Sequence, residues 1–262
     1  LCGGAETGSG KTAAFLLPIL ERLLQGRHQA AQTRVLILLP TRELAVQCHE
    51  VAVKLCKHAP RIQVALAAGG LPVRPQEAAL RARPDVVIGT PGRIIDHLAN
   101  APGFSLDRLE ILVLDEADRM LEEGFEDELN QILEQLGGHG QRQTMLFSAS
   151  LDDNVQSLMR LALRKPVRLQ LDNSMAIARR LTQEFVRVRG EGGEEDRLVL
   201  LASLAVRTCP TRCIVFLPTK ELTHRCRILF GLLGLAAAEL HGGLSQPERL
   251  AALERFKRGQ AT

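Results

Sequence analysis

The sequence predicts an α/β fold, a parallel sheet wrapped by helices, followed by a second and shorter unit of the same kind. Short unbroken apolar runs such as Ile111–Leu114 are typical of strands that helices cover on both faces. These runs alternate with helical patterns, for example at residues 44–58. That alternation favours parallel strands joined by right-handed crossovers. The 262 residues are enough for one large domain and part of another.

The first unit is expected to span residues 1–171 and to contain most of the sheet. Its first strand would survive only as Leu1 and Cys2, because a glycine-rich segment follows at once. The other expected strands lie at residues 35–39, 63–67, 86–88, 111–114, 145–147 and 167–171. The clearest helical patterns lie at residues 13–24, 44–58, 76–81 and 126–136.

A polar stretch at residues 172–180 is expected to be a linker. The pattern then starts again in a second unit, residues 181–262, which we expect to be a partial copy of the same fold. Its expected strands lie at residues 182–188, 213–217 and 237–240, and its expected helices at 195–205, 221–233 and 246–257.

The segment at residues 5–12 has the composition of a loop that binds phosphate groups. Gly8 and Gly10 allow a tight turn whose amides approach an anion, at the positive end of the helix that follows. Lys11 would reach the β- and γ-phosphates, and the Thr12 hydroxyl would ligate Mg²⁺. The general pattern has glycine where Ala5 stands, and the alternative is an ordinary polar turn before a helix. The proposed nucleotide-binding residues are Ala5, Glu6, Thr7, Gly8, Ser9, Gly10, Lys11 and Thr12.

Acidic residues follow the apolar run at 111–114. Asp115 would hold Mg²⁺ through water, and Glu116 would orient and deprotonate the attacking water. Acids at this end of a parallel strand lie where α/β sheets bind ligands. The alternative is a helix start with favourable negative charge. Together with the loop, the acids favour a nucleotide-hydrolysing site with Lys11, Asp115 and Glu116 as its catalytic residues.

Three further segments follow strands of the same sheet and suit contact with a nucleic-acid backbone. They are Pro40-Thr41-Arg42, Gly69-Gly70 and Thr90-Pro91-Gly92-Arg93. Hydroxyls, amides and guanidinium groups at helix starts can hold phosphates. The alternatives are a plain helix start with Thr41 as its cap and a flexible glycine turn. Eight phenylalanines, with no tryptophan or tyrosine, make a base-stacking surface a poor expectation.

Composition sets broad limits on the class of protein. The formal net charge of +3 is small, so a nucleic-acid surface would be a local patch. Six cysteines without a secretory signal favour a reducing intracellular compartment. The sequence has no apolar run near the roughly 20 residues that span a bilayer, so we expect no membrane contact.

Several of these motifs together resemble the DEAD-box ATP-dependent RNA helicases. The motifs AETGSGKT, PTRELAVQ, the paired glycines, TPGR, DEAD and SAS occur in that family's order, and HGG and QPER resemble its second-domain motifs. The resemblance covers nearly the whole chain. It implies two RecA-like domains, the first of the P-loop NTPase type and the second truncated. The family's upstream adenine-reading element and its last arginine motifs are not in this sequence.

The resemblance also implies roles. ATP with Mg²⁺ would be the cofactor, and RNA, gripped by its backbone with little sequence preference, would be the partner. Gln246 and Arg249 would add RNA contacts, while Asp118, Ser148 and Ser150 would couple nucleotide state to domain closure. The family more often has threonine where Ser150 stands, and because either hydroxyl can bond Asp118, the link is expected to survive. The segments EADRMLEEGFEDELNQIL and RQTMLFSAS resemble most the branch that acts on ribosomal RNA. That branch implies ribosome-assembly proteins as partners and location in the nucleus and nucleolus.

Two alternatives remain open at this point. One is another helicase-like P-loop ATPase that acts on DNA. The other is a non-catalytic module for RNA binding or assembly, which the absent motifs favour.

Overall fold

The computed structural model describes residues 1–4, 10–26, 31–136, 142–150, 152–170, 181–188, 193–208 and 212–261. The chain divides into two compact units, Leu1–Ile177 and Ala178–Thr262. The expected linker at residues 172–180 and the loop residues Ala5, Glu6, Thr7, Gly8 and Ser9 lie outside the described residues.

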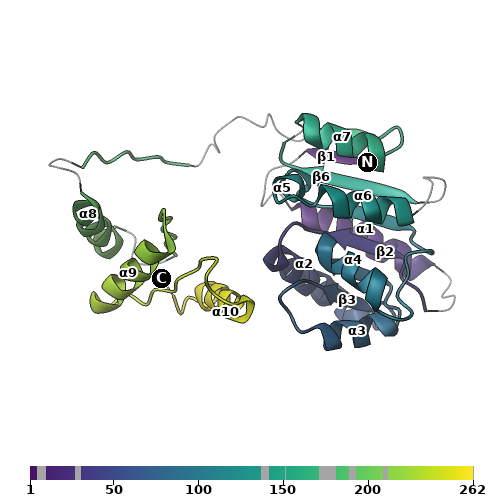
Figure 1. The fold of residues 1–262 in the computed structure, drawn as a ribbon, viewed down its shortest axis with the longest axis horizontal. Helices are drawn as coiled ribbons and strands as arrows, with labels where there is room; N and C mark the ends of the chain where they lie inside the picture. Colours follow the sequence, from purple (N-terminus) through teal and green to yellow (C-terminus); the bar gives the residue numbers. More distant parts are fainter. Residues whose placement is uncertain are drawn as a thin grey trace. The chain divides into compact units, whose positions relative to one another are not determined.

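The first unit is built on a seven-stranded sheet in which all paired strands run parallel, as the alternating pattern predicted (Figure 1). The strand order is β3-β4-β2-β5-β6-β1-β7. The strands are β1 Cys2–Gly4, β2 Val35–Leu38, β3 Val64–Ala67, β4 Val86–Gly89, β5 Ile111–Leu114, β6 Gln143–Ser148 and β7 Arg168–Gln170. The first strand is thus longer than expected and continues to Gly4.

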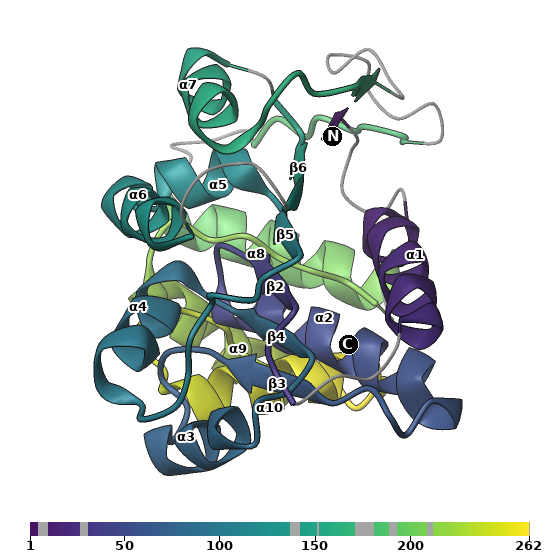
Figure 2. The ribbon, with the colours of Figure 1, turned by 90° about the vertical axis from the view of Figure 1, so that its right-hand side faces the viewer.

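Helices cover both faces of this sheet. Figure 2 shows α1 and α2 on one side of the strands and α4, α5, α6 and α7 on the other. The helices are α1 Lys11–Gln25, α2 Arg42–Leu55, α3 Val73–Arg81, α4 Pro91–Asn100, α5 Ala117–Glu122, α6 Glu126–Gln135 and α7 Asp153–Ala162, and a 3-10 turn, η1 Cys56–His58, ends α2. This arrangement encloses two apolar cores, one on each face.

The two cores explain why the central strands have no polar positions. Strands β2, β4 and β5 are buried at every residue. Successive side chains point to opposite faces, so Leu36 packs in the core under α4 to α7 while Ile37 packs in the core under α1 and α2. A strand buried on both faces must be apolar throughout, which is why unbroken runs located these strands in the sequence.

The second unit differs from the expectation. Its helices are α8 Glu194–Arg207, α9 Lys220–Leu232 and α10 Gln246–Lys257, close to the predicted ranges. The strands predicted at 182–188, 213–217 and 237–240 are wrong, since the structure forms no strand in the described part of this unit. Alternation of apolar residues gives an extended segment with one face on the helices, but a strand also needs a hydrogen-bonded neighbour. Phe216 is 93% exposed, so one face of its segment is uncovered.

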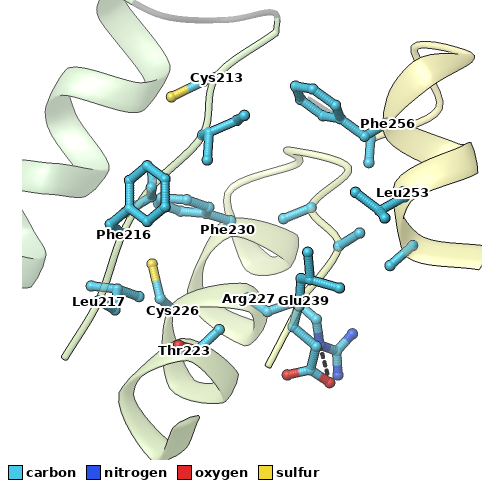
Figure 3. A pocket seen from close by; sticks show the side chains of 17 residues that line it. Cys213, Phe216, Leu217, Thr223, Cys226, Arg227, Phe230, Glu239, Leu253 and Phe256 are labelled. Atoms are coloured by element: carbon cyan, nitrogen blue, oxygen red, sulfur yellow. Dashed lines mark ion pairs between the residues drawn. The ribbon is translucent and has the colours of Figure 1, made fainter. Parts of the chain in front are cut away.

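An apolar hollow of about 260 Å³ opens between this extended segment and the helices of the second unit (Figure 3). Phe216 and Leu217 line it from the extended segment, and Phe230 lines it from α9. At one end Arg227 Nε lies 3.4 Å from a carboxylate oxygen of Glu239. The hollow belongs to the second unit and contains none of the predicted nucleotide-site residues.

Candidate functional site

The predicted site residues of the first unit lie where its parallel strands end. Strands β1, β5 and β6 are neighbours in the sheet, and so are β2, β3 and β4. We call the first group of strand ends the acidic half of this carboxyl edge: Lys11 after β1, Asp115, Glu116 and Asp118 after β5, and Ser148, Ala149 and Ser150 at the end of β6. The second group is the arginine half: Thr41 and Arg42 after β2, Gly69 and Gly70 after β3, and Thr90 to Arg93 after β4.

In the acidic half, α1 begins at the predicted phosphate loop. Gly10 is the N-cap residue of α1 and has φ 91°, a left-handed conformation that favours glycine. Lys11, the first helical residue, is only 9% exposed, and Thr12 is half-buried. The helix start therefore places a buried ammonium group and a hydroxyl next to the loop, as an anion-binding helix N-terminus requires.

Asp115 is a buried carboxyl group with an altered pKa. It is 5% exposed, directly after β5, and its Oδ1 accepts a hydrogen bond of 3.0 Å from the Glu116 amide. Burial raises the pKa of Asp115 to about 6, although the nearby charge of Lys11 lowers it. Lys11 and Asp115 are therefore close enough to interact. A divalent cation here would offset the buried negative charge, so the donor set fits Mg²⁺.

Glu116 is held in an unusual backbone conformation. Its φ and ψ are both 52°, in the left-handed region that few non-glycine residues adopt. The side chain is buried, and its Oε2 accepts a hydrogen bond of 3.0 Å from Arg119 Nη1. Strain of this kind is typical of functional sites, where the surroundings enforce it. Sequence reasoning missed Arg119, although its spacing of three residues from Glu116 on α5 was the available signal.

Asp118 joins the acids to the end of β6, through other atoms than expected. Its Oδ2 accepts hydrogen bonds from the amides of Ala149, at 3.1 Å, and Ser150, at 2.9 Å. Ser148 Oγ accepts from the Asp118 amide at 3.3 Å. The Ser150 hydroxyl instead contacts Asp152 Oδ2 at 3.5 Å, so the expected bond from that hydroxyl to Asp118 is wrong. Backbone amides reach the carboxylate because both follow a strand end, and they need no particular side chain.

In the arginine half, α2 brings Arg42 next to the paired glycines. Thr41 Oγ1 accepts a hydrogen bond of 3.4 Å from the Leu44 amide, so Thr41 is the N-cap of α2. The exposed Arg42 guanidinium lies against Gly69, where an added Cβ would be 3.5 Å from Arg42 Nε. Gly70 has φ 71° and is exposed. The structure thus places Arg42, Gly69 and Gly70 side by side.

The start of α4 completes the arginine half. The Thr90 amide donates a hydrogen bond of 3.1 Å to the Ala67 carbonyl, which fixes the ends of β3 and β4 to each other. A Cβ at Gly89 would collide with that carbonyl, so only glycine fits there. Pro91 is buried in the first turn of α4, and Gly92 is half-buried. Arg93 is largely buried, and its Nη1 lies 3.9 Å from Asp96 Oδ2 within the same helix.

Two predicted residues belong to the second unit. Gln246 is buried in the first turn of α10, and Arg249 Nη1 donates to its Oε1 at 3.4 Å. Ser245 and Glu248 form a capping box at the same helix start. Because these two residues lie in a different unit from the carboxyl edge, their prediction as RNA contacts stays a prediction.

Within the described part of the chain, no helix combines the length and the apolar composition that a membrane span needs.

The family model for DEAD/DEAH box helicases matches residues 1–158. A second model, for the helicase conserved C-terminal domain, matches residues 196–262.

Curated relatives match both units. The chain is 54% identical over 260 residues to the ATP-dependent RNA helicase drs1 of Sclerotinia sclerotiorum, covering 99% of this chain and 32% of the relative. It is 52% identical over 260 residues to the protein of the same name from Schizosaccharomyces pombe, covering 99% of this chain and 34% of the relative. The chain spans about a third of the length of the curated relatives it matches. Because the first of these family models covers residues 1–158, more than half of the chain, the chain belongs to the DEAD/DEAH box helicase family.

Proposed function

We propose that the protein of which this chain is part is an ATP-dependent RNA helicase, an ATPase that RNA stimulates and that remodels RNA duplexes or RNA–protein complexes. The observation that carries the proposal is the buried acidic half. There Asp115, whose pKa is raised to about 6, is close enough to Lys11 to feel its charge and is next to Glu116, which has a left-handed backbone. Phosphoryl transfer to water needs a cation to stabilise the phosphate charge and carboxylates to hold Mg²⁺ and orient the water. Burial strengthens these interactions.

The chain's own residues divide the work on the nucleotide. Residues 5–12 would cradle the phosphates, with Lys11 as their charged donor. Thr12 and Asp115 would hold Mg²⁺, which neutralises phosphate charge when bound. Glu116 would orient the attacking water and accept its proton, and Arg119 would keep the Glu116 carboxylate in place. Asp118 would couple the state of this site to the end of β6 through the hydrogen bonds that its carboxylate accepts from two backbone amides.

The arginine half would bind RNA through its sugar–phosphate backbone. Arg42 is an exposed cation beside amides of a glycine turn, and both kinds of donor suit phosphate oxygens. A surface without aromatic side chains reads backbone rather than bases, which supports weak sequence preference. Gln246 and Arg249 would add contacts from the second unit, and 2′-hydroxyls would distinguish RNA from DNA.

The wider setting is part of the same proposal. The domain organisation is a RecA-like ATP-binding domain at residues 1–171, a linker at 172–180 and part of a RecA-like C-terminal domain at 181–262. Ribosome biogenesis in the nucleolus, with ribosome-assembly proteins as partners, rests on the resemblance of residues 116–133 and 142–150 to the branch that acts on ribosomal RNA.

A single assay tests the central proposal. Phosphate release is measured with this chain and with a longer form of the protein, each with single-stranded RNA, single-stranded DNA or neither. Stimulation by RNA alone is expected in the longer form. Equal stimulation by DNA would replace the proposal with a DNA-directed ATPase. Binding of ATP and RNA without turnover in either form would indicate a non-catalytic RNA-binding module.

A further inference from the structure

A buried glutamine forms hydrogen bonds with the backbone on both sides of the glycine turn in the arginine half. Gln76, on α3, is 6% exposed. Its Nε2 lies 3.0 Å from the Ala68 carbonyl, 3.3 Å from that of Leu71 and 3.1 Å from that of Pro72. These carbonyls stand on both sides of the turn at residues 69–70. One amide group therefore fixes both ends of the turn.

A buried histidine fixes the orientation of that amide. His97, on α4, is 2% exposed, and its Nε2 lies 3.2 Å from Gln76 Oε1. Carbonyls only accept hydrogen bonds, so the amide nitrogen must face the turn and Oε1 must face His97. His97 Nε2 must then carry the proton. Burial, and secondly the charge of Arg93, lower the pKa of His97, which favours this neutral form, while Glu77 and Asp96 act against the shift.

The two residues connect elements that carry predicted RNA contacts. Gln76 contacts the turn that packs against the Arg42 guanidinium at Gly69. His97 belongs to the helix that begins with the segment Thr90 to Arg93. Two glycines in succession have the largest backbone freedom of any dipeptide, so such a turn is not ordered by its own sequence. A turn that Gln76 already holds in place would lose less conformational freedom when it binds a phosphate.

We propose that Gln76 and His97 are positioning residues, which fix the Gly69–Gly70 turn relative to α4 and so preorganise the arginine half for the RNA backbone. The inference rests on the proposed function. It adds two buried residues that touch no RNA themselves. Their loss should weaken RNA binding and leave the acidic half, on the other strands of the sheet, unaffected.

The test compares RNA and nucleotide affinity in matched variants. Gln76→Met keeps the length and volume of the side chain and removes its hydrogen bonds. The control is Gln63→Met, because Gln63 Nε2 also donates to a turn carbonyl, Pro60 at 3.0 Å, but at the other end of β3. The probe for RNA is a fluorescent oligouridine of about ten nucleotides, read by anisotropy. The nucleotide probe is a fluorescent ATP analogue.

We expect Gln76→Met to weaken oligouridine binding at least about fivefold, with nucleotide affinity and Gln63→Met both within about twofold of the wild type. His97 supplies the second pair of variants. His97→Leu should lose oligouridine affinity as Gln76→Met does. His97→Gln keeps a donor for Gln76 Oε1, so it should retain most of the oligouridine affinity.

Each other outcome overturns some part of this view. A folded Gln76→Met that binds oligouridine like the wild type would refute the positioning role, and so would an equal loss of RNA and nucleotide affinity. If Gln76→Met does not fold, the two His97 variants decide, and failure of all of them to fold would mean that the network serves the whole domain. If the wild-type chain itself does not bind oligouridine, the proposed function fails first, at its own assay.

Discussion

The two halves of the carboxyl edge use one sheet in opposite ways. In the acidic half the acting groups are side chains, and Asp115, Glu116 and Asp118 are all less than 9% exposed. In the arginine half Arg42 and Gly70 are exposed, whereas Thr90 and Pro91 at the start of α4 and the supporting Gln76 are buried. One edge of one sheet thus carries buried charged side chains at the ends of β1, β5 and β6, and an exposed arginine beside a glycine turn at the ends of β2 and β3.

The difference follows from what each half would have to bind. Chemistry on a phosphate gains from exclusion of water, because burial strengthens every charge interaction and shifts pKa values, as at Asp115. A nucleic-acid strand is a long polyanion that must enter from solvent, so its contacts must be exposed. Burial therefore supplies reactivity in one half and only support in the other.

The largest expected effect separates chemistry from binding. Glu116→Gln keeps the size of the side chain and an oxygen that can accept from Arg119 Nη1, but it removes the base. In a longer, active form, turnover should fall by about 10² to 10⁴-fold while ATP and RNA affinities stay unchanged. Phosphate release and equilibrium binding measure the two effects. Near-normal turnover would mean that Glu116 serves only the start of α5.

The next prediction concerns stability in the absence of nucleotide and divalent cations. Because the folded pKa of Asp115 is raised from 3.8 to about 6, its folded form gains stability when protonated and loses that stability as pH rises through 6. Asp115→Asn should therefore increase the free energy of unfolding at pH 7 by roughly 3 kcal/mol, and much less near pH 4. Urea titrations at both pH values check this. A variant less stable than the wild type at pH 7 would contradict it.

A tenfold effect is expected at the other charge of the acidic half. Lys11→Ala removes the buried ammonium group, so ATP affinity should fall at least about tenfold, or 1.4 kcal/mol. Affinity for RNA in the absence of nucleotide should not change, because the arginine half lies on other strands. Calorimetry measures the first and anisotropy the second. Parallel losses in both would mean that the two halves are not separate.

The smallest effect is expected in the arginine half. Arg42→Ala should weaken binding of unrelated single-stranded RNAs by a similar factor, roughly threefold, and flatten the log–log salt slope by about 0.7. The control is Arg61→Ala, an exposed arginine just before β3 at the opposite edge of the sheet. Thermal melting confirms that both variants fold. A loss confined to one RNA sequence would point to base reading and exclude a backbone grip.

These comparisons also explain what the sequence could predict. Strands such as Val35–Leu38 and Ile111–Leu114 were readable because a strand buried on both faces leaves an unbroken apolar run. In the second unit, the alternating residues Ile214 and Phe216 predicted a strand, but both are exposed and their segment forms no strand. The pattern of one segment does not show whether a neighbouring strand is present to pair with it.

Hydrogen bonds between distant segments were harder to predict. The link from Asp118 to β6 uses amides that every residue has, so no side chain signalled it. Gln76 and His97 are polar residues on helices, where a polar residue ordinarily indicates a solvent-facing position. The packing of α3 against β3, and the contact of His97 with Gln76, show that both residues are buried.

The left-handed backbone at Glu116 restricts which amino acids this position can exchange with. A left-handed conformation is least unfavourable for glycine, asparagine and aspartate, and it adds about 1 to 2 kcal/mol for most other side chains. Branched replacements at this codon would therefore combine a lost carboxylate with a distorted chain. Ranked by their free energy of unfolding, variants at position 116 would separate first by their preference for the left-handed conformation. Chemical similarity to glutamate would order them only within those groups.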